Sequence, residues 1–170
     1  LPQHPHPRIA GVAPRIMHHF LYFDMGNVLL DFDHQLGCER VAALCDVSAD
    51  RVREVIFDSG MEWKYERGDL TSEQFFDYFR GEIPNTPTLK VLLEAISDIF
   101  QSKPEVERLL DRLVKLGHSL GILSNTCEAH WNHVHPHRFP FLAERFKLHA
   151  LSFELRAMKP ETEIYERALR

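Results

Sequence analysis

The sequence predicts an α/β protein organised around a parallel β-sheet, and three observations indicate this. Residues 20–23 form a short apolar run that stops at Asp24 and continues into a turn rich in Gly and Asn. A second apolar run, residues 120–123, stops at Ser124, and a helical pattern over residues 104–113 precedes it. Because ligands bind at the carboxyl ends of the strands in open α/β sheets, we expect Asp24 and Ser124 to share one functional edge.

The rest of the predicted core alternates helices and strands. Pro104 begins a helix that Gly117 ends, just before the second strand. Another helix is expected from about Glu128, a further strand within residues 146–153, and a last helix that Pro160 opens. The apolar positions expected to be buried on the first and last of these helices are Val106, Leu109, Leu110 and Leu113, and Ile164, Tyr165, Ala168 and Leu169.

A long helical segment, residues 34–100, follows the first strand in place of the next strand of the sheet. Ser48 and Thr88 occupy typical N-cap positions, and Thr71 with Gln74 forms a capping-box pattern. We predict four helices here, and we interpret their apolar stripes as core packing. These stripes comprise Val41, Leu44 and Cys45; Val52, Val55 and Ile56; Phe75, Phe76 and Phe79; and Leu89, Leu92, Leu93, Ile96 and Phe100.

Three stretches, in this order, resemble motifs I, II and III of the haloacid dehalogenase (HAD) superfamily: residues 20–30, residues 120–126 and residues 156–161 with their Lys-Pro. The resemblance spans residues 20–170 and is nearest to the branch reading FD-x-GNV, which includes sugar-phosphate phosphatases of the α-D-glucose-1-phosphate phosphatase type. It implies a HAD-type Rossmannoid parallel sheet with an inserted α-helical C1 cap. The core would be residues 17–33 and 101–170, and the cap residues 34–100.

The resemblance also implies a phosphoryl-transfer chemistry. The Asp24 carboxylate would attack phosphorus and form an aspartyl phosphate, which splits one hydrolysis into two displacements. Donors at Ser124 and Asn125 would hold the phosphoryl oxygens, and the compact Lys159 ammonium would offset their charge. Taken singly, each residue has a structural alternative: an Asp that caps a turn, a Ser that caps a helix and a surface Lys.

Mg²⁺ is the cofactor that the resemblance implies, held by Asp24, the main-chain carbonyl of Gly26 and an acidic residue beyond the third motif. After Lys159 the carboxylates are Glu161, Glu163 and Glu166, which we expect to be solvated on a helix. The expected fourth-motif strand and acidic pair would lie beyond Arg170. We therefore interpret the chain as truncated and expect the 170-residue form to be catalytically inactive or nearly so.

Gly26 stands where HAD phosphatases usually carry the Asp that protonates the leaving oxygen, a contribution of about 10²–10⁴-fold. Its presence leaves open a dehalogenase, whose halide needs no proton, although those enzymes usually read D-x-Y-G-T. A non-catalytic HAD scaffold that binds a partner or ligand is the other alternative. Asp31 and Asp33 are either surrogate acids or residues that end the strand extension and cap the next helix. The turn at residues 62–68 is the best candidate for selecting a small phosphorylated metabolite, by the resemblance a sugar phosphate, because the aromatic and basic groups of the turn suit a polar ligand.

Composition limits the other functional classes. A net charge of −5 with mixed signs gives no indication of nucleic-acid binding, and no apolar run has the length of a membrane span. Three widely spaced cysteines favour a reduced, cytoplasmic setting over a disulfide framework. Residues 1–16 resemble a flexible extension, with Met17 as the natural start. Nothing in the sequence indicates an oligomeric state.

A histidine segment after the second motif is the remaining constellation. Its potential ligands are Cys127, His130, His133, His135 and His137. The Cys-x2-His-x2-His spacing suggests zinc, but no second ligand cluster at matched spacing accompanies it. We therefore favour incidental histidines, and we place His130 on the helix after Ser124, facing the site.

Overall fold

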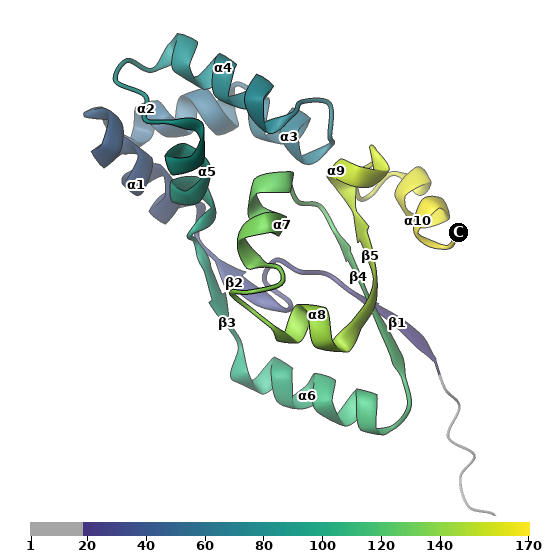
Figure 1. Cartoon of the computed structure of the whole chain (residues 1–170). Helices are drawn as coiled ribbons and strands as arrows, with labels where there is room; N and C mark the ends of the chain where they lie inside the picture. The colour runs from purple at the N-terminus through teal and green to yellow at the C-terminus, as the bar shows by residue number, and fades with distance from the viewer. Residues whose placement is uncertain (1–18) are drawn as a thin grey trace, which may run out of the picture.

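The computed structural model describes residues 19–170, so the expectations for residues 1–16 and for Met17 lie outside the described residues. Its centre is a three-stranded parallel sheet in the order β1-β4-β5, formed by β1 (Phe20–Phe23), β4 (Ser119–Ser124) and β5 (Phe146–Leu151). Phe23 is paired with Ile122, so the carboxyl ends of β1 and β4 lie side by side (Figure 1). The predicted α/β class and parallel sheet are confirmed.

The chain leaves this sheet through a tight turn and a second, antiparallel pair of strands. The Met25 carbonyl accepts hydrogen bonds from the main-chain N–H groups of Leu29, at 2.9 Å, and Leu30, at 3.0 Å. β2 (Leu30–Phe32) then pairs with β3 (Phe100–Ser102). Phe100 was expected on a helical stripe and this was wrong, because the strand pairing begins there.

Between β2 and β3 lies a helical module, residues 34–98. Its elements are α1 (His34–Cys45), α2 (Ala49–Arg53), a π-helical turn η1 (Glu54–Asp58), α3 (Met61–Glu66), α4 (Ser72–Glu82) and α5 (Leu89–Ser97). The predicted N-caps are confirmed: Ser48, Thr71 and Thr88 each accept a main-chain N–H with their side-chain oxygen. The capping box of Thr71 and Gln74 is complete.

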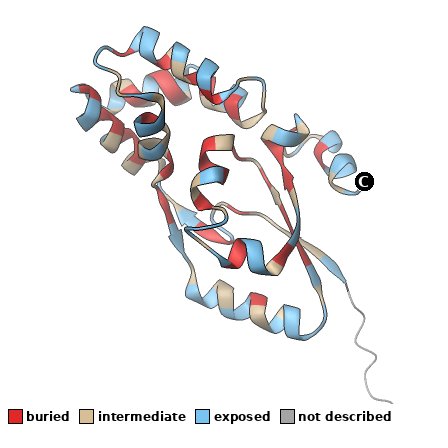
Figure 2. Cartoon of the chain, viewed as in Figure 1, coloured by how far each residue is buried: buried red, intermediate tan, exposed pale blue. Residues whose placement is uncertain are grey.

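Side chains from these helices form a hydrophobic core, which Cys127 and Ala129 at the start of the later helix α7 (Glu128–Val134) complete (Figure 2). Val41, Phe79 and Leu92 are fully buried in it. Two expectations were wrong here. Leu44 is 46% exposed on the outer face of α1, and residues 62–66 of the expected turn are helical in α3.

A second hydrophobic core lies around the sheet, where α6 (Pro104–Lys115), α7 (Glu128–Val134) and α8 (Phe141–Arg145) pack. Pro104 begins α6 and Glu128 begins α7, as predicted. Leu110 and Leu120 are fully buried, whereas Leu109 is 45% exposed and was wrongly assigned to the buried face.

The last elements are shorter than the sequence predicted. β5 ends at Leu151 rather than near residue 153, and α9 (Ser152–Leu155) follows. α10 (Thr162–Ala168) begins two residues after Pro160, with Glu161 at its N-cap. α10 packs on α9 and β5 and buries Ile164, but Tyr165 is 43% exposed and Leu169 81% exposed, so most of its expected apolar face is not buried.

Figure 1 shows the helical module above the carboxyl ends of the sheet strands, with α3 near the segment that joins α9 and α10. Any group at those strand ends therefore lies between the module and the sheet. Across residues 19–170, every helix is too short or too polar to cross a membrane.

Candidate active site

Asp24 and Lys159 meet at the carboxyl end of β1. The Lys159 Nζ lies 2.6 Å from Asp24 Oδ2, and Asp24 Oδ1 accepts the main-chain N–H of Met25 at 2.8 Å. Both side chains are partly exposed. The carboxylate is thus fixed in position and still reachable from solvent, as a nucleophile must be.

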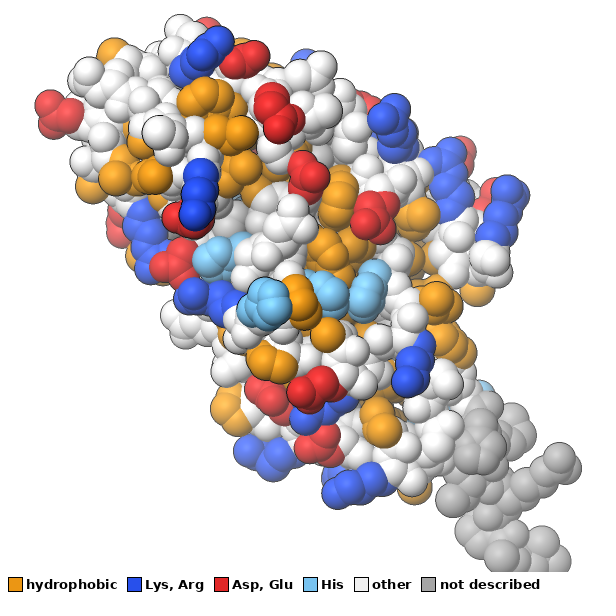
Figure 3. Space-filling view, viewed as in Figure 1, with side chains coloured by type: hydrophobic (Ala, Val, Ile, Leu, Met, Phe, Trp, Pro, Cys, Tyr) orange, Lys and Arg blue, Asp and Glu red, His pale blue; other side chains and the backbone are white. Residues whose placement is uncertain are grey.

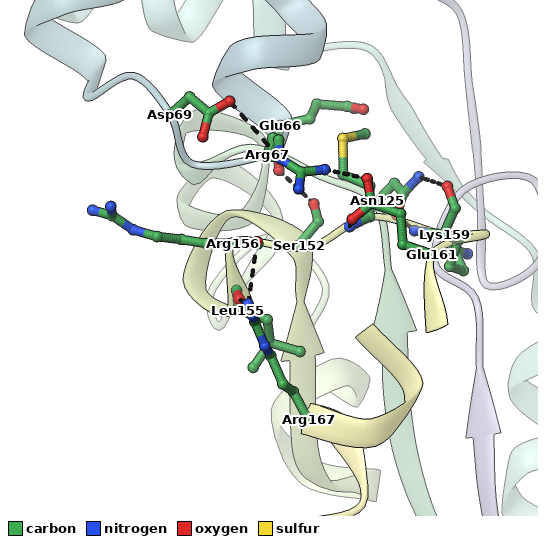
Figure 4. A network of polar contacts seen from close by, with 11 residues as sticks. Glu66, Arg67, Asp69, Asn125, Ser152, Leu155, Arg156, Lys159, Glu161 and Arg167 are labelled. Carbon is green, nitrogen blue, oxygen red and sulfur yellow. Dashed lines mark hydrogen bonds and ion pairs between the residues drawn. The ribbon is translucent and has the colours of Figure 1, made fainter. Parts of the chain in front are cut away.

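Asn125 ties the end of β4 to the Lys159 segment. Its Oδ1 accepts the Lys159 main-chain N–H at 2.8 Å, and its Nδ2 donates to the Lys159 carbonyl at 3.1 Å (Figure 4). Ser124 is 1% exposed and donates to the Asn125 carbonyl at 3.2 Å. Asn125 therefore holds Lys159 in register with Asp24, and direct contact of Ser124 or Asn125 with a phosphoryl group stays a prediction. We call these four residues, Asp24, Ser124, Asn125 and Lys159, the strand-end site.

The ring of Phe32 occupies the space that a side chain at Gly26 would need. A Cβ built on Gly26 would lie 2.6 Å from Phe32 Cε1, so any larger residue requires the ring to move. Asp31 is ion-paired with Lys103 at 2.6 Å, and Asp33 caps α1 by accepting the Gln35 N–H at 2.8 Å. Both aspartates have structural roles in this arrangement, as the second of the two alternatives predicted.

A small cavity, here called the Gly26 cavity, adjoins the strand-end site. Its walls are Met25, Gly26, Phe32, His34, Glu66, Phe100, Asn125, Thr126 and His130. Thr126 is 1% exposed, and its Oγ1 has no hydrogen-bond partner within the described part of the chain. A buried hydroxyl without a partner is costly, so this one is available to a ligand oxygen in the cavity. We did not single out Thr126 from the sequence, although it directly follows Asn125.

Glu66, at the end of α3, lies within the stretch 62–68 that the sequence analysis proposed for substrate selection, although it was not singled out there. Burial raises the pKa of Glu66 to about 7. The charge of Asp24 is the second cause of this increase, while the charge of Lys159 lowers the pKa. A carboxyl in the Gly26 cavity is therefore partly protonated near neutral pH. His130 lines the same cavity, as expected, and burial followed by the nearby His34 lowers the pKa of His130 to about 4, which leaves it neutral.

A group of contacts docks the end of α3 onto the segment around Lys159. Arg67 pairs with Glu161, whose other carboxylate oxygen accepts the Met158 main-chain N–H at 3.2 Å (Figure 4). The Ser152 hydroxyl donates to the Glu66 carbonyl at 2.5 Å. We call the Arg67–Glu161 pair the clasp, because it joins the helical module to the loop that carries Lys159.

The oxygen atoms available at the site are of the types that bind Mg²⁺. Asp24 offers a carboxylate and Gly26 a main-chain carbonyl, which are the hard ligands that Mg²⁺ prefers, and waters and a substrate phosphate normally complete its shell. Over residues 19–170 no three His, Cys, Asp or Glu side chains are close enough together to hold an ion by themselves. Glu161 is committed to the clasp, so few protein ligands remain for a cation here.

The histidine segment does not converge on one point. Cys127 and His130 are buried, His133 Nε2 lies 3.6 Å from Asp98, and His135 stacks on Trp131 with ring centroids 4.5 Å apart. Figure 3 shows histidine side chains at the surface on this face of the molecule. The segment therefore presents separate packing contacts and not a ligand cluster.

Solved structures of the same fold include HAD enzymes. A HAD family enzyme, BT-2542 from Bacteroides thetaiotaomicron, in complex with magnesium and inorganic phosphate, has a TM-score of 0.77 at 24% identity over 89% of this chain and 77% of that one. A predicted HAD-like family hydrolase from Porphyromonas gingivalis gives 0.74 at 21% identity over 89% and 74%. A HAD phosphatase from Thermococcus onnurineus gives 0.56 at 18% identity over 90% and 70%. No family model matches the chain. The likeness establishes the fold.

Proposed function

We propose that the protein is a Mg²⁺-dependent phosphatase of small phosphorylated metabolites that works through an aspartyl phosphate on Asp24. The observation that carries the proposal is the 2.6 Å pair of Asp24 and Lys159, with Asn125 holding Lys159, at the ends of adjacent parallel strands. A carboxylate beside a fixed ammonium is suited to attack a phosphoryl group whose charge the ammonium then offsets. The fold shared with HAD enzymes is consistent with this chemistry.

In the first step an Asp24 oxygen forms a bond to phosphorus and the bond to the leaving alkoxide breaks. In the second, water attacks phosphorus, and phosphate is released with the Asp24 carboxylate restored. Lys159 would exchange its contact with Asp24 for the phosphoryl oxygens, and the hydroxyls of Ser124 and Thr126 would donate to them. Mg²⁺ held by Asp24 and the Gly26 carbonyl would supply further charge neutralisation.

The leaving oxygen also needs a proton, which Gly26 cannot supply. Glu66 is the carboxyl that lines the same cavity as Gly26 and is held mainly by burial in a form that retains a proton near neutral pH. We assign it this role in the proposal. The helical module would act as the cap that selects the substrate, and the resemblance of the sequence favours sugar phosphates. Three unpaired, buried cysteines suit a reducing compartment, so we propose the cytoplasm.

Two other functions compete with this one. In a haloacid dehalogenase, Asp24 would attack carbon and halide would leave without a proton, which agrees with Gly26 but leaves the unpartnered Thr126 hydroxyl without a role. In a non-catalytic scaffold, the strand-end site would only bind. The phosphatase is favoured because Lys159 and the buried hydroxyls together suit an anionic phosphoryl group.

Release of inorganic phosphate from a panel of phosphate monoesters, with and without Mg²⁺, tests the proposal, and halide release from 2-haloacids tests the alternative. We expect slow, Mg²⁺-dependent phosphate release that Asp24→Asn removes. The rate should be low because the described residues offer the ion one certain carboxylate. Halide release, or no release of either product by the folded protein, would contradict the proposal.

A further inference from the structure

Ser152, the residue that follows β5, joins three segments of the chain. It is fully buried, and its hydroxyl oxygen accepts the main-chain N–H of Thr126 at 2.9 Å. The same oxygen lies 2.5 Å from the Glu66 carbonyl oxygen and 3.0 Å from the Thr126 carbonyl oxygen. A hydroxyl has a single proton to donate, and the shorter distance assigns it to Glu66 (Figure 4). Ser152 thus connects the end of α3 with the loop after β4.

Both partners of Ser152 line the Gly26 cavity, whereas Ser152 itself does not. Glu66 is the last residue of α3 in the helical module, and Thr126 lies in the loop that follows β4 of the sheet. Ser152 therefore acts on the site through these two neighbours. It fixes a residue of the module relative to a residue of the core.

The position of the Glu66 carboxyl depends on how its main chain is held. Across the described residues no hydrogen bond or ion pair involves this carboxyl, although the charges of Asp24 and Lys159 act on it. The Glu66 carbonyl lies in the last turn of α3, where helix carbonyls lack partners within the helix. The Ser152 hydroxyl supplies a partner for it and so fixes the point from which the Glu66 side chain extends.

The residues that follow Glu66 are also bound to the core at this point. Gly68 has a φ of +80°, and a Cβ on it would clash with the Phe153 carbonyl oxygen. The main chain at Gly68 therefore lies directly against the main chain at Phe153, next to the hydrogen bond between Ser152 and Glu66. With the clasp at Arg67, three successive residues at the end of α3 contact the core.

We infer that Ser152 is a positioning residue for proton transfer, because its hydrogen bond to the Glu66 carbonyl holds the Glu66 carboxyl where it protonates the leaving oxygen. The inference rests on the proposed function, in which Glu66 is that acid. As the bond between phosphorus and the leaving oxygen breaks, the Glu66 proton passes to that oxygen and Glu66 becomes a carboxylate. In the second displacement the attacking water returns a proton to Glu66, so one turnover leaves it unchanged.

The test uses two esters whose leaving groups differ in their need for a proton. The alkoxide of glucose 6-phosphate is strongly basic, whereas the 4-nitrophenolate of 4-nitrophenyl phosphate is stable as an anion. We expect Ser152→Ala to lower kcat/KM for glucose 6-phosphate by about tenfold, part of the roughly 10²–10⁴-fold that general acid–base catalysis contributes. It should lower kcat/KM for 4-nitrophenyl phosphate by no more than about twofold. An equal loss on both esters would overturn the inference.

A double-mutant cycle shows whether Ser152 acts through Glu66. If it does, adding Ser152→Ala to Glu66→Gln should change kcat/KM for glucose 6-phosphate by less than about twofold, because the acid is already absent. Losses that multiply in the double variant would overturn the inference and leave the proposed function standing. A Glu66→Gln variant as active as the wild type on glucose 6-phosphate, or a wild type that hydrolyses neither ester, would overturn the proposed function together with the inference.

Ser72→Ala is the matched control. Ser72 is also buried, donates to Glu128 at 2.5 Å and contacts the Tyr65 hydroxyl of α3 at 2.7 Å, but in the described part of the chain it has no hydrogen bond to either partner of Ser152. It should lower the melting temperature, as Ser152→Ala should, and leave the ratio of the two kcat/KM values at that of the wild type.

Ser152→Cys keeps the shape of the side chain but replaces the hydroxyl with a weak donor, so it serves if Ser152→Ala does not fold. It should show the same ester-selective loss. An unchanged ratio in the Ser152 variants, or an equal change of the ratio in Ser72→Ala, would overturn the inference.

Discussion

The strand-end site and a deeper apolar cavity, lined among others by Ile56, Phe75 and Ile96 and here called the Ile96 cavity, are built in different ways. At the strand-end site, short chain segments bring the groups together: two strand ends and the Lys159 loop, joined through main-chain hydrogen bonds to Asn125. The wall of the Ile96 cavity comes from side chains on several helices of the module and on α7. We therefore expect mutations at the strand-end site to affect the rate of the proposed reaction, and mutations in the wall of the Ile96 cavity to affect stability.

The largest effect is expected at Asp24. Asp24→Asn should lower phosphate release by roughly 10³-fold or more, because it removes the nucleophile from an otherwise intact constellation. Its melting temperature should stay near that of the wild type, since the side chain is partly exposed and accepts one main-chain N–H. Initial rates and a thermal melt check this. An Asp24→Asn variant that keeps its activity would contradict the assignment of the reaction to the strand-end site.

Lys159 is expected to matter almost as much. Lys159→Met keeps the length of the side chain but removes the ammonium that lies 2.6 Å from Asp24, and it should lower kcat by roughly 10²–10³-fold. The melting temperature should stay close to that of the wild type, since Lys159 is not among the residues lining the Ile96 cavity. A large drop in the melting temperature would show that the two regions are not separable.

The clasp should have an intermediate effect, since it joins the module to the Lys159 loop. Arg67→Met should lower kcat by about tenfold by loosening the position of Lys159, with little change in stability because the pair is near the surface. Arg80→Met is the matched control: Arg80 also pairs with an acid, Asp77, and lies over an aromatic ring, but outside both cavities. If both variants lose activity equally, the clasp has no special role.

The Ile96 cavity should also show itself in the pH dependence of stability. Because burial raises the pKa of Glu62 to about 8, the folded protein holds a proton that the unfolded chain loses near pH 4.5, so this contribution to stability falls as pH rises towards 8. Buried His130, with its lowered pKa, has the opposite effect only below about pH 6.5. Urea unfolding should therefore show stability falling between pH 6.5 and 8, by at most about 1.4 kcal/mol per pH unit from Glu62. A Glu62→Gln variant should show a flatter profile, and an equally steep one would contradict this.

The smallest effect is expected from treating the protein with a chelator, because the histidine segment makes packing contacts and needs no metal. His133 and His135 contact Asp98 and Trp131, so a chelator should leave the melting temperature unchanged. A large drop that Zn²⁺ reverses would show that the segment binds metal after all. Differential scanning fluorimetry with and without chelator is sufficient for the comparison.

Much of the strand-end site follows from local signals in the sequence. An apolar run that stops at Asp24, another that stops at Ser124, and a Lys-Pro pair at Lys159 predict groups at one sheet edge, because strand ends of a parallel sheet converge. The N-caps at Ser48 and Thr88 were equally readable, since side-chain caps are local.

The rest depends on contacts between distant segments. α3 starts after Gly60, at φ +77°, without a side-chain cap, so no local signature marks it and the side chain of Glu66 could not be placed. The spacing of Glu62 and Glu66, four residues apart, becomes informative only once α3 is known to be a helix. The ring of Phe32 against Gly26 is likewise a tertiary contact, and it gives a physical reason for a glycine there.

The most direct test of the account is to locate the phosphoryl group during turnover. The protein would be mixed with phenyl phosphate and Mg²⁺, quenched in acid within the first turnover, digested and examined by mass spectrometry. The account predicts a phosphoryl group on the peptide that contains Asp24, at the Asp24 side chain, and its absence in Asp24→Asn. Phosphate release without any such adduct, or a phosphoryl group on a different residue, would contradict it.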